Sequence, residues 1–408
     1  MSYGSAVLAL LLVTSQTLFA EDRTAEWRQD LGALAAELKR VHPRFRECGF
    51  PPDFEARRSA LSTRIGGLSD EQAVVEVQRL LASVGDGHTL SWPFGMKKGT
   101  LLRLPLMLWS FEEGLYVIDA SDRDLIGKRV VHIGGVPAAE VLGRLEPLVS
   151  HDNAEQVLWA APLYATLTDF LAAVGATDDR NSAILGLDGG RRAAVLAEPI
   201  DPAALRVKLI APKTAAAPLY LSRAEDPFWS AELPGGVLYV QVNTMNDGRA
   251  ETLAAFASAL RRRVAGFRAV VVDLRLNNGG EASKADELLR TLIAADTQGV
   301  RLAVLTSRMT FSAAQTFAAR IDQWTGAVFI GQPTGSKPNH YGNERKFRLP
   351  NSGLQGTISS GLNQPVTARD ERATIAPDIA VATRATDYFA GADPTLDAAV
   401  RALTANRQ

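Results

Sequence analysis

The sequence has little that would support disulfide or metal chemistry. Its 408 residues include a single cysteine, Cys48, which has no partner for an internal disulfide bond. The five histidines do not form an H-E-x-x-H motif, and the paired cysteines of a zinc site are absent. We therefore expect no metal and no other cofactor.

An excess of charge of either sign is also missing. The 44 basic and 45 acidic side chains give a formal net charge of −1. A chain this close to neutral has no general electrostatic attraction for a phosphate backbone, so we expect no nucleic acid partner. The G-x-S-x-G motif of α/β-hydrolases does not occur. The lysine that follows the serine of penicillin-binding proteins is replaced, after Ser312, by Gln315.

Charge is absent altogether from residues 1–20, which centre on an apolar run from Ala6 to Val13. This pattern predicts a secretory signal peptide cleaved after Ala20, although the usual basic residue near the start is missing. The apolar run is shorter than the ~20 residues that a membrane span requires. We expect a secreted or periplasmic protein without a stable membrane span.

The chain after the signal begins with a helical pattern. Between Glu26 and Leu81, apolar residues recur at spacings of three and four, which predicts three helices. Asp53 and Ser69 are expected to cap the second and third helices. We assign residues 21–95 to a helical amino-terminal domain.

A β-rich pattern follows. From about 101 to 199, short apolar runs are divided by Gly, Asp and Pro, which predicts strands and turns with one helix near 138–148. The segment PKTAAAP, residues 212–218, is typical of a linker. We assign residues 96–212 to a β-rich module.

Strands and helices alternate in the last part of the chain, 213–408. Strands are expected at 237–243, 269–275, 301–307 and 327–331, and helices at 251–264, 284–295 and 312–321. Continuous Val and Leu runs separated by amphipathic helices predict an α/β fold with a mostly parallel sheet covered on both faces. Ligands bind such sheets at the carboxyl ends of the strands.

Ser312 stands at one of those ends, in the run MTFSAAQ, and has two interpretations. With Gln315 it matches a capping box, in which each residue hydrogen-bonds the backbone of the other. Alternatively it is a nucleophile, because a helix start offers unpaired N–H groups and partial positive charge to a developing oxyanion. The neighbouring strand ends in Gly279 and Gly280, which permit close approach of the backbone. Ser312, the Ala313 amide and an amide of either glycine would then form an acyl-transfer site.

The ordered motifs GDGHT, DLRLNNGG, TFSAAQ and GQPTGSK resemble those of the tail-specific, or C-terminal-processing, serine peptidases and their tricorn-protease-like relatives. The resemblance covers nearly the whole mature chain. It implies a crotonase-like, ββα-type α/β core, preceded by a helical domain and a PDZ-like module in the β-rich region. It also implies a serine endopeptidase acting on a peptide or protein substrate, with Ser312 as the nucleophile.

The resemblance offers two bases for Ser312. Lys337, 25 positions later in GQPTGSK, matches the spacing of the Ser-Lys dyad of the processing peptidases. A lysine acts as a base once burial lowers its pKa. His88, in GDGHT, lies where tricorn-like members carry a catalytic histidine. There the orienting carboxylate would be Glu371, with Asp370 as the adjacent option.

We favour His88, because a histidine needs no large pKa shift to act near neutral pH. His340 and Tyr341 follow Lys337 closely and are expected to contact the substrate. A non-catalytic protein that binds peptides or apolar ligands on the same fold remains the alternative, since a fold does not establish activity.

Overall fold

The computed structural model describes residues 4–205 and 208–405, with side chains in the first helix described from Arg23 onward. The predicted signal peptide and its cleavage site at Ala20 therefore lie outside the described side chains. A search of the described residues finds no helix that combines the length and the apolar character needed to cross a membrane.

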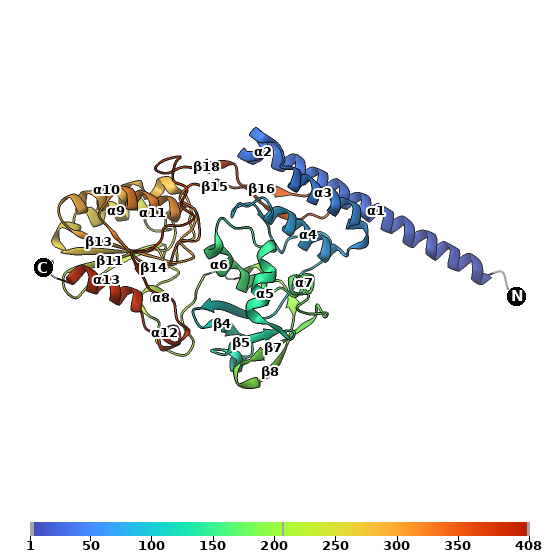
Figure 1. Cartoon of the computed structure of the whole chain (residues 1–408), viewed down its shortest axis with the longest axis horizontal. Helices are drawn as coiled ribbons and strands as arrows, with labels where there is room; N and C mark the ends of the chain where they lie inside the picture. Colours follow the sequence, from blue (N-terminus) through green and yellow to red (C-terminus); the bar gives the residue numbers. More distant parts are fainter. Residues whose placement is uncertain (1–3, 206–207, 406–408) are drawn as a thin grey trace.

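The amino-terminal region is helical, as predicted, with four described α-helices where three were expected (Figure 1). Its helices are α1 (Gly4–Val41), α2 (Pro43–Cys48), α3 (Pro52–Arg64) and α4 (Asp70–Ala82). Ser69 caps α4 as expected. The predicted cap at Asp53 is wrong, because α3 begins at Pro52 and Asp53 falls in its first turn. Proline fits the first helical turn, where its missing N–H removes no bond.

The β-rich region contains an antiparallel sheet in the order β3-β4-β5-β7-β8. The strands are β3 (Leu106–Phe111), β4 (Gly114–Ala120), β5 (Arg129–Ile133), β7 (Ser182–Leu187) and β8 (Arg192–Leu196). Two strands of two residues, β2 (Leu102–Arg103) and β9 (Glu198–Pro199), pair with each other.

Three helices accompany this sheet where one was expected: α5 (Ala138–Leu145), α6 (Ala154–Tyr164) and α7 (Thr168–Ala173). The helix predicted near 138–148 is α5. The pattern missed α6 because Pro162 lies inside it, and an interior proline normally argues against a helix.

The carboxyl-terminal region has a six-stranded sheet in the order β10-β11-β12-β13-β14-β19. The strands are β10 (Phe228–Leu233), β11 (Val237–Val242), β12 (Ala269–Asp273), β13 (Arg301–Thr306), β14 (Val328–Gly331) and β19 (Ile379–Ala380). Only the β10–β11 pair is antiparallel within this sheet. The predicted mixed α/β class is confirmed.

Helices cover both faces of this sheet (Figure 1). One face packs against α9 (Leu253–Arg261), α10 (Asp286–Thr297) and α11 (Ala313–Trp324), and the other against α13 (Pro394–Thr404). Two short helices, α8 (Leu219–Ser222) and α12 (Ala385–Ala390), complete the region.

One carboxyl-terminal segment leaves the α/β sheet and crosses to the helical region (Figure 1). It contains β15 (His340–Gly342), β16 (Arg345–Arg348), β17 (Gln355–Ile358) and β18 (Gly361–Asn363). Within it, β17 pairs with β1 (Leu90–Ser91), which directly follows the GDGHT motif. This crossing brings a loop from the amino-terminal third of the chain to the carboxyl-terminal region. The domain boundaries given above stay predictions.

Candidate active site

The turn between β13 and α11 has an unusual backbone at Ser312. Its φ of 57° and ψ of −124° make it one of two non-glycine residues with positive φ in the described chain. Such a conformation costs on the order of 1–3 kcal/mol, and it persists where the surrounding structure enforces it. A strained strand-to-helix turn is also how α/β-hydrolases expose their serine. The backbone at Ser312 therefore has the form expected for a nucleophile.

The Ser312 hydroxyl does not cap its helix. No side-chain capping bond is present at the start of α11, and the hydroxyl has no other hydrogen bond to a described residue. Both polar atoms of the Gln315 side chain are buried without a partner. The capping-box hypothesis for Ser312 and Gln315 is wrong, because positive φ turns the serine away from the N3 amide.

Gly279 lies directly beside this turn, and Gly280 follows it in the chain. A Cβ atom added to Gly279 would lie 2.7 Å from the Ser312 Cβ, so no larger residue fits. The Gly279 N–H donates to Asn277 Oδ1 at 3.0 Å and is therefore already used. Gly280 and Ala313 have no backbone N–H bond to a described residue. Of the two glycines predicted for the oxyanion hole, the free amide is that of Gly280.

The His88 side chain is buried, with 2% of its surface exposed, and lies in a stack of rings. Its ring centroid is 4.4 Å from that of Phe311, at an interplanar angle of 20°, and 5.6 Å from that of His340. Because Phe311 directly precedes Ser312, the stack brings the predicted base to the turn of the predicted nucleophile. Neither ring nitrogen has a hydrogen bond.

Two carboxylates lie near the His88 ring. The Oδ1 atom of Asp86 is 3.8 Å from Nδ1, and the Oε1 atom of Glu344 is 3.9 Å from Nε2. Neither is predicted from the sequence, although Asp86 stands two residues before His88 in GDGHT. That position was a usable signal, whereas nothing in the pattern around Glu344 indicated it.

Lys337 and Glu371 are not brought to His88 or buried. The Lys337 side chain is exposed, so it lacks the burial that a catalytic lysine base requires. Glu371 is exposed too, and it forms no ion pair within 4 Å of any described residue. Its neighbour Asp370 instead pairs with Arg372 at 2.8 Å.

The two residues expected to contact the substrate differ in environment. His340 is 3% exposed, and its Nδ1 lies 3.0 Å from the Lys337 carbonyl oxygen. Burial and the nearby His88 lower the pKa of His340. It therefore forms part of the wall behind His88. Tyr341 is half-buried, with its ring 4.7 Å from that of His42, a buried residue that the sequence analysis did not single out.

Two polar residues at the end of β12, Asp273 and Arg275, have a structural role. Arg275 pairs with Asp273 at 2.6 Å and with Asp393 at 2.7 Å. Asp393 caps α13, so the three side chains tie this helix to the edge of the sheet where the site lies.

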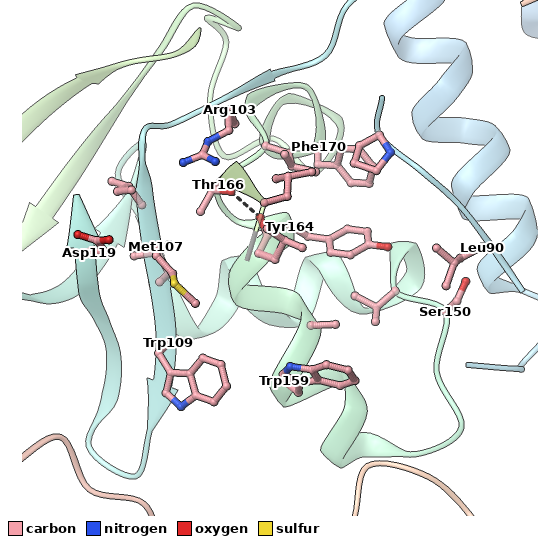
Figure 2. Close-up of a pocket in the computed structure, with 18 of the residues that line it drawn as sticks. Leu90, Arg103, Met107, Trp109, Asp119, Ser150, Trp159, Tyr164, Thr166 and Phe170 are labelled. Atoms are coloured by element: carbon pink, nitrogen blue, oxygen red, sulfur yellow. Dashed lines mark hydrogen bonds between the residues drawn. The ribbon is translucent and has the colours of Figure 1, made fainter. Parts of the chain in front are cut away.

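A largely apolar cavity of about 570 Å³ opens beside the site. Its lining includes Trp109 on β3, Trp159 and Tyr164 on α6, and Phe170 on α7 (Figure 2). Gly87 and Phe311 also line it. These two residues are the chain neighbours of His88 and Ser312, so the cavity adjoins both predicted catalytic side chains.

Comparisons with known proteins bear on the family and on the fold. Residues 236–301 match the model of peptidase family S41, a segment that includes Gly279 and Gly280 but neither Ser312 nor His88. No curated protein matches the chain.

Among solved structures, mature CPAF complexed with lactacystin has a TM-score of 0.64 at 12% identity, over 93% of this chain and 98% of that chain. Mature CPAF gives a TM-score of 0.63 at 13% identity, over 93% and 97%. The photosystem II D1 C-terminal processing protease gives 0.44 at 14% identity, over 93% and 98%. The likeness to CPAF shows that the fold is shared.

Proposed function

We propose that this chain, which is related to the tail-specific peptidases of family S41, is a serine endopeptidase that works through an acyl-enzyme on Ser312. The observation that carries the proposal is the Ser312 turn. A half-buried serine is held at positive φ, free of its helix cap, and follows Phe311, whose ring stacks on the buried imidazole of His88. An ordinary helix start has no reason to keep this strain.

The proposed reaction follows from the groups around the turn. The Ser312 Oγ bonds to the substrate carbonyl carbon while its proton passes to His88. The amides of Ala313 and Gly280 receive the charge on the carbonyl oxygen. The amine product leaves with the proton from His88, and water then cleaves the acyl-enzyme by the same route.

The cavity supports a peptide substrate with large apolar residues. Its volume of about 570 Å³ lies within the range of roughly 300–1,000 Å³ typical of ligand pockets. One wall is β3, an edge strand whose only partner in the described sheet is β4. An edge strand can bind an extended peptide through its free backbone groups. We propose that the β-rich region acts as a PDZ-like module that receives the apolar end of a substrate chain here.

We also propose that the protein is exported to the periplasm or the medium. The support is the uncharged apolar segment over residues 1–20. Amino-terminal sequencing of protein from the extracytoplasmic fraction should begin at Glu21.

A fluorophosphonate probe tests the central proposal, because it reacts covalently with activated serines. We expect the purified protein to be labelled, and labelling to be lost in Ser312→Ala and reduced at least a hundredfold in His88→Ala. Lys337→Ala should keep the wild-type labelling rate, since Lys337 is exposed.

Loss of labelling in Lys337→Ala, with His88→Ala unaffected, would assign the base to the lysine instead. Absence of labelling of the wild type between pH 5 and 10 would favour the alternative, a non-catalytic protein that binds peptides or apolar ligands.

A further inference from the structure

Asp86 is a buried carboxylate between two imidazoles. It has no exposed surface. Its Oδ1 lies 3.8 Å from Nδ1 of His88, and its Oδ2 lies 3.3 Å from Nε2 of His42. The His88 backbone N–H also donates to Oδ1 at 2.9 Å, and the Thr89 hydroxyl donates to Oδ2 at 2.6 Å. The carboxylate is thus fixed on both oxygens while one of them faces the ring of the proposed base.

Asp86 keeps its negative charge despite this burial. Burial raises its pKa, but the hydrogen bond from His42, the charge of His88 and the hydrogen bond from Thr89 outweigh it and lower the pKa to about 2. In the described part of the chain, no lysine or arginine forms an ion pair with Asp86. A buried charge without a cationic partner is costly, so the carboxylate depends on the polar groups that contact it: the His42 ring, the His88 backbone N–H and the Thr89 hydroxyl.

Asp86 and Glu344 approach different ring nitrogens of His88. A catalytic imidazole uses one nitrogen for the serine and the other for the carboxylate that orients it. Asp86 faces Nδ1 and so leaves Nε2 for Ser312. Glu344 faces Nε2, the nitrogen that the serine needs, and its side chain is 45% exposed. Glu371 is exposed and has no ion pair in the described structure.

We propose that Asp86, and neither Glu344 nor Glu371, is the positioning residue that keeps the proton of neutral His88 on Nδ1, with His42 fixing Asp86 from the other side. The inference rests on the proposed function, because it assigns the partner of the proposed base. The separation of 3.8 Å closes to a hydrogen bond when substrate binds, as catalytic contacts in free enzymes commonly do. When the Ser312 proton reaches Nε2, Asp86 stabilises the imidazolium and itself takes no proton.

Three matched amide variants test this assignment: Asp86→Asn, Glu344→Gln and Glu371→Gln. Each removes one charge and keeps the size of the side chain. We expect Asp86→Asn to lower kcat by about 10³- to 10⁴-fold with little change in KM, because the asparagine favours the wrong tautomer. The two glutamine variants should each lose less than about tenfold. A loss of 10³-fold or more in Glu371→Gln, with Asp86→Asn close to wild type, would overturn the proposal.

A measurement on the wild type guards against misfolding of Asp86→Asn. In protein labelled with ¹⁵N-histidine, the nitrogen shifts above the imidazole titration report which ring nitrogen carries the proton, and the His88 signals are identified by their loss in His88→Gln. We expect the Nδ1–H tautomer. The Nε2–H tautomer would exclude Asp86 as the partner, even if fluorophosphonate labelling had already established Ser312 as the nucleophile. Failure of labelling would instead count against the proposed function.

Discussion

Two helices of this protein begin with the same four-residue pattern, a serine followed three residues later by glutamine, and only one of them is capped. At α4, Ser69 accepts from the Gln72 amide, and the Gln72 side chain accepts from the Ser69 amide. At α11, Ser312 and Gln315 make neither bond. The backbone explains the difference: φ and ψ are −68° and 169° at Ser69, but 57° and −124° at Ser312.

Tertiary contacts force the second arrangement. The Phe311 amide donates to the Asn277 carbonyl at 3.2 Å, and the Thr310 hydroxyl donates to the Leu274 carbonyl at 3.1 Å. These bonds hold the chain before Ser312 against the end of β12, with Gly279 pressed beside the serine. The Ser-x-x-Gln pattern predicts the cap that a helix start adopts when no tertiary contact opposes it. Here the neighbouring strand overrides that preference and releases the hydroxyl.

The largest expected effect comes from Ser312→Gly. We expect loss of probe labelling and peptidase activity, together with a gain in the free energy of unfolding of about 1 kcal/mol, because glycine adopts positive φ without strain. Urea unfolding of the two proteins measures the gain. If Ser312→Gly were destabilised by as much as an ordinary glycine at a helix start, the strain inferred from the backbone would be absent.

Ser69→Ala is expected to lose stability and keep probe labelling, the opposite of Ser312→Gly. Loss of this cap should lower the free energy of unfolding by about 1 kcal/mol and leave the labelling rate of Ser312 unchanged. Thermal unfolding and probe kinetics on the same sample check both parts. Ser312→Ala is the matched control, since it should lose labelling without a capping penalty. An equal loss of stability in both alanine variants would erase the contrast between the two helix starts.

The smallest changes in the free energy of unfolding are expected from substitutions of Gln315 and Gln72. Gln315→Met should be neutral or raise the free energy of unfolding by up to about 1 kcal/mol, because two buried polar atoms without partners are replaced by an apolar chain of similar size. Gln72→Met should lower it by about 0.5 kcal/mol, because it removes half of a formed capping box. Denaturant midpoints compare the pair, and a clear loss in Gln315→Met would mean that its amide has a partner in solution.

The pattern of the sequence predicted well what depends on neighbouring residues. The alternation of Val-rich runs with amphipathic helices located β11 to β14 and α9 to α11, because the periodicity of apolar residues follows the secondary structure directly. The same reasoning missed α6, where Pro162 interrupts the local pattern but packing against β3 sustains the helix.

The candidate site was predictable in part for the same reason. The DLRLNNGG and TFSAAQ motifs are short continuous segments, so the residues within each motif lie close together in any fold. The partner of His88 depends instead on which side of a buried ring each carboxylate reaches. Asp86 is not predicted from the sequence pattern, and the resemblance points instead to Glu371, which is exposed in the structure.

The sequence by itself determined the elements of this protein, the two glycines that follow β12 and the resemblance of its motifs to those of the tail-specific serine peptidases. Tertiary structure decided the rest. Ser312 leaves its helix uncapped, and the pairing of β17 with β1 holds the loop of His88 against the carboxyl-terminal segment. The buried carboxylate of Asp86 faces Nδ1 of His88. The physical reason is the distance along the chain over which each effect acts. Periodicity and turn chemistry act over a few residues, whereas backbone strain, ring stacking and the pairing of buried charges arise only when distant segments meet.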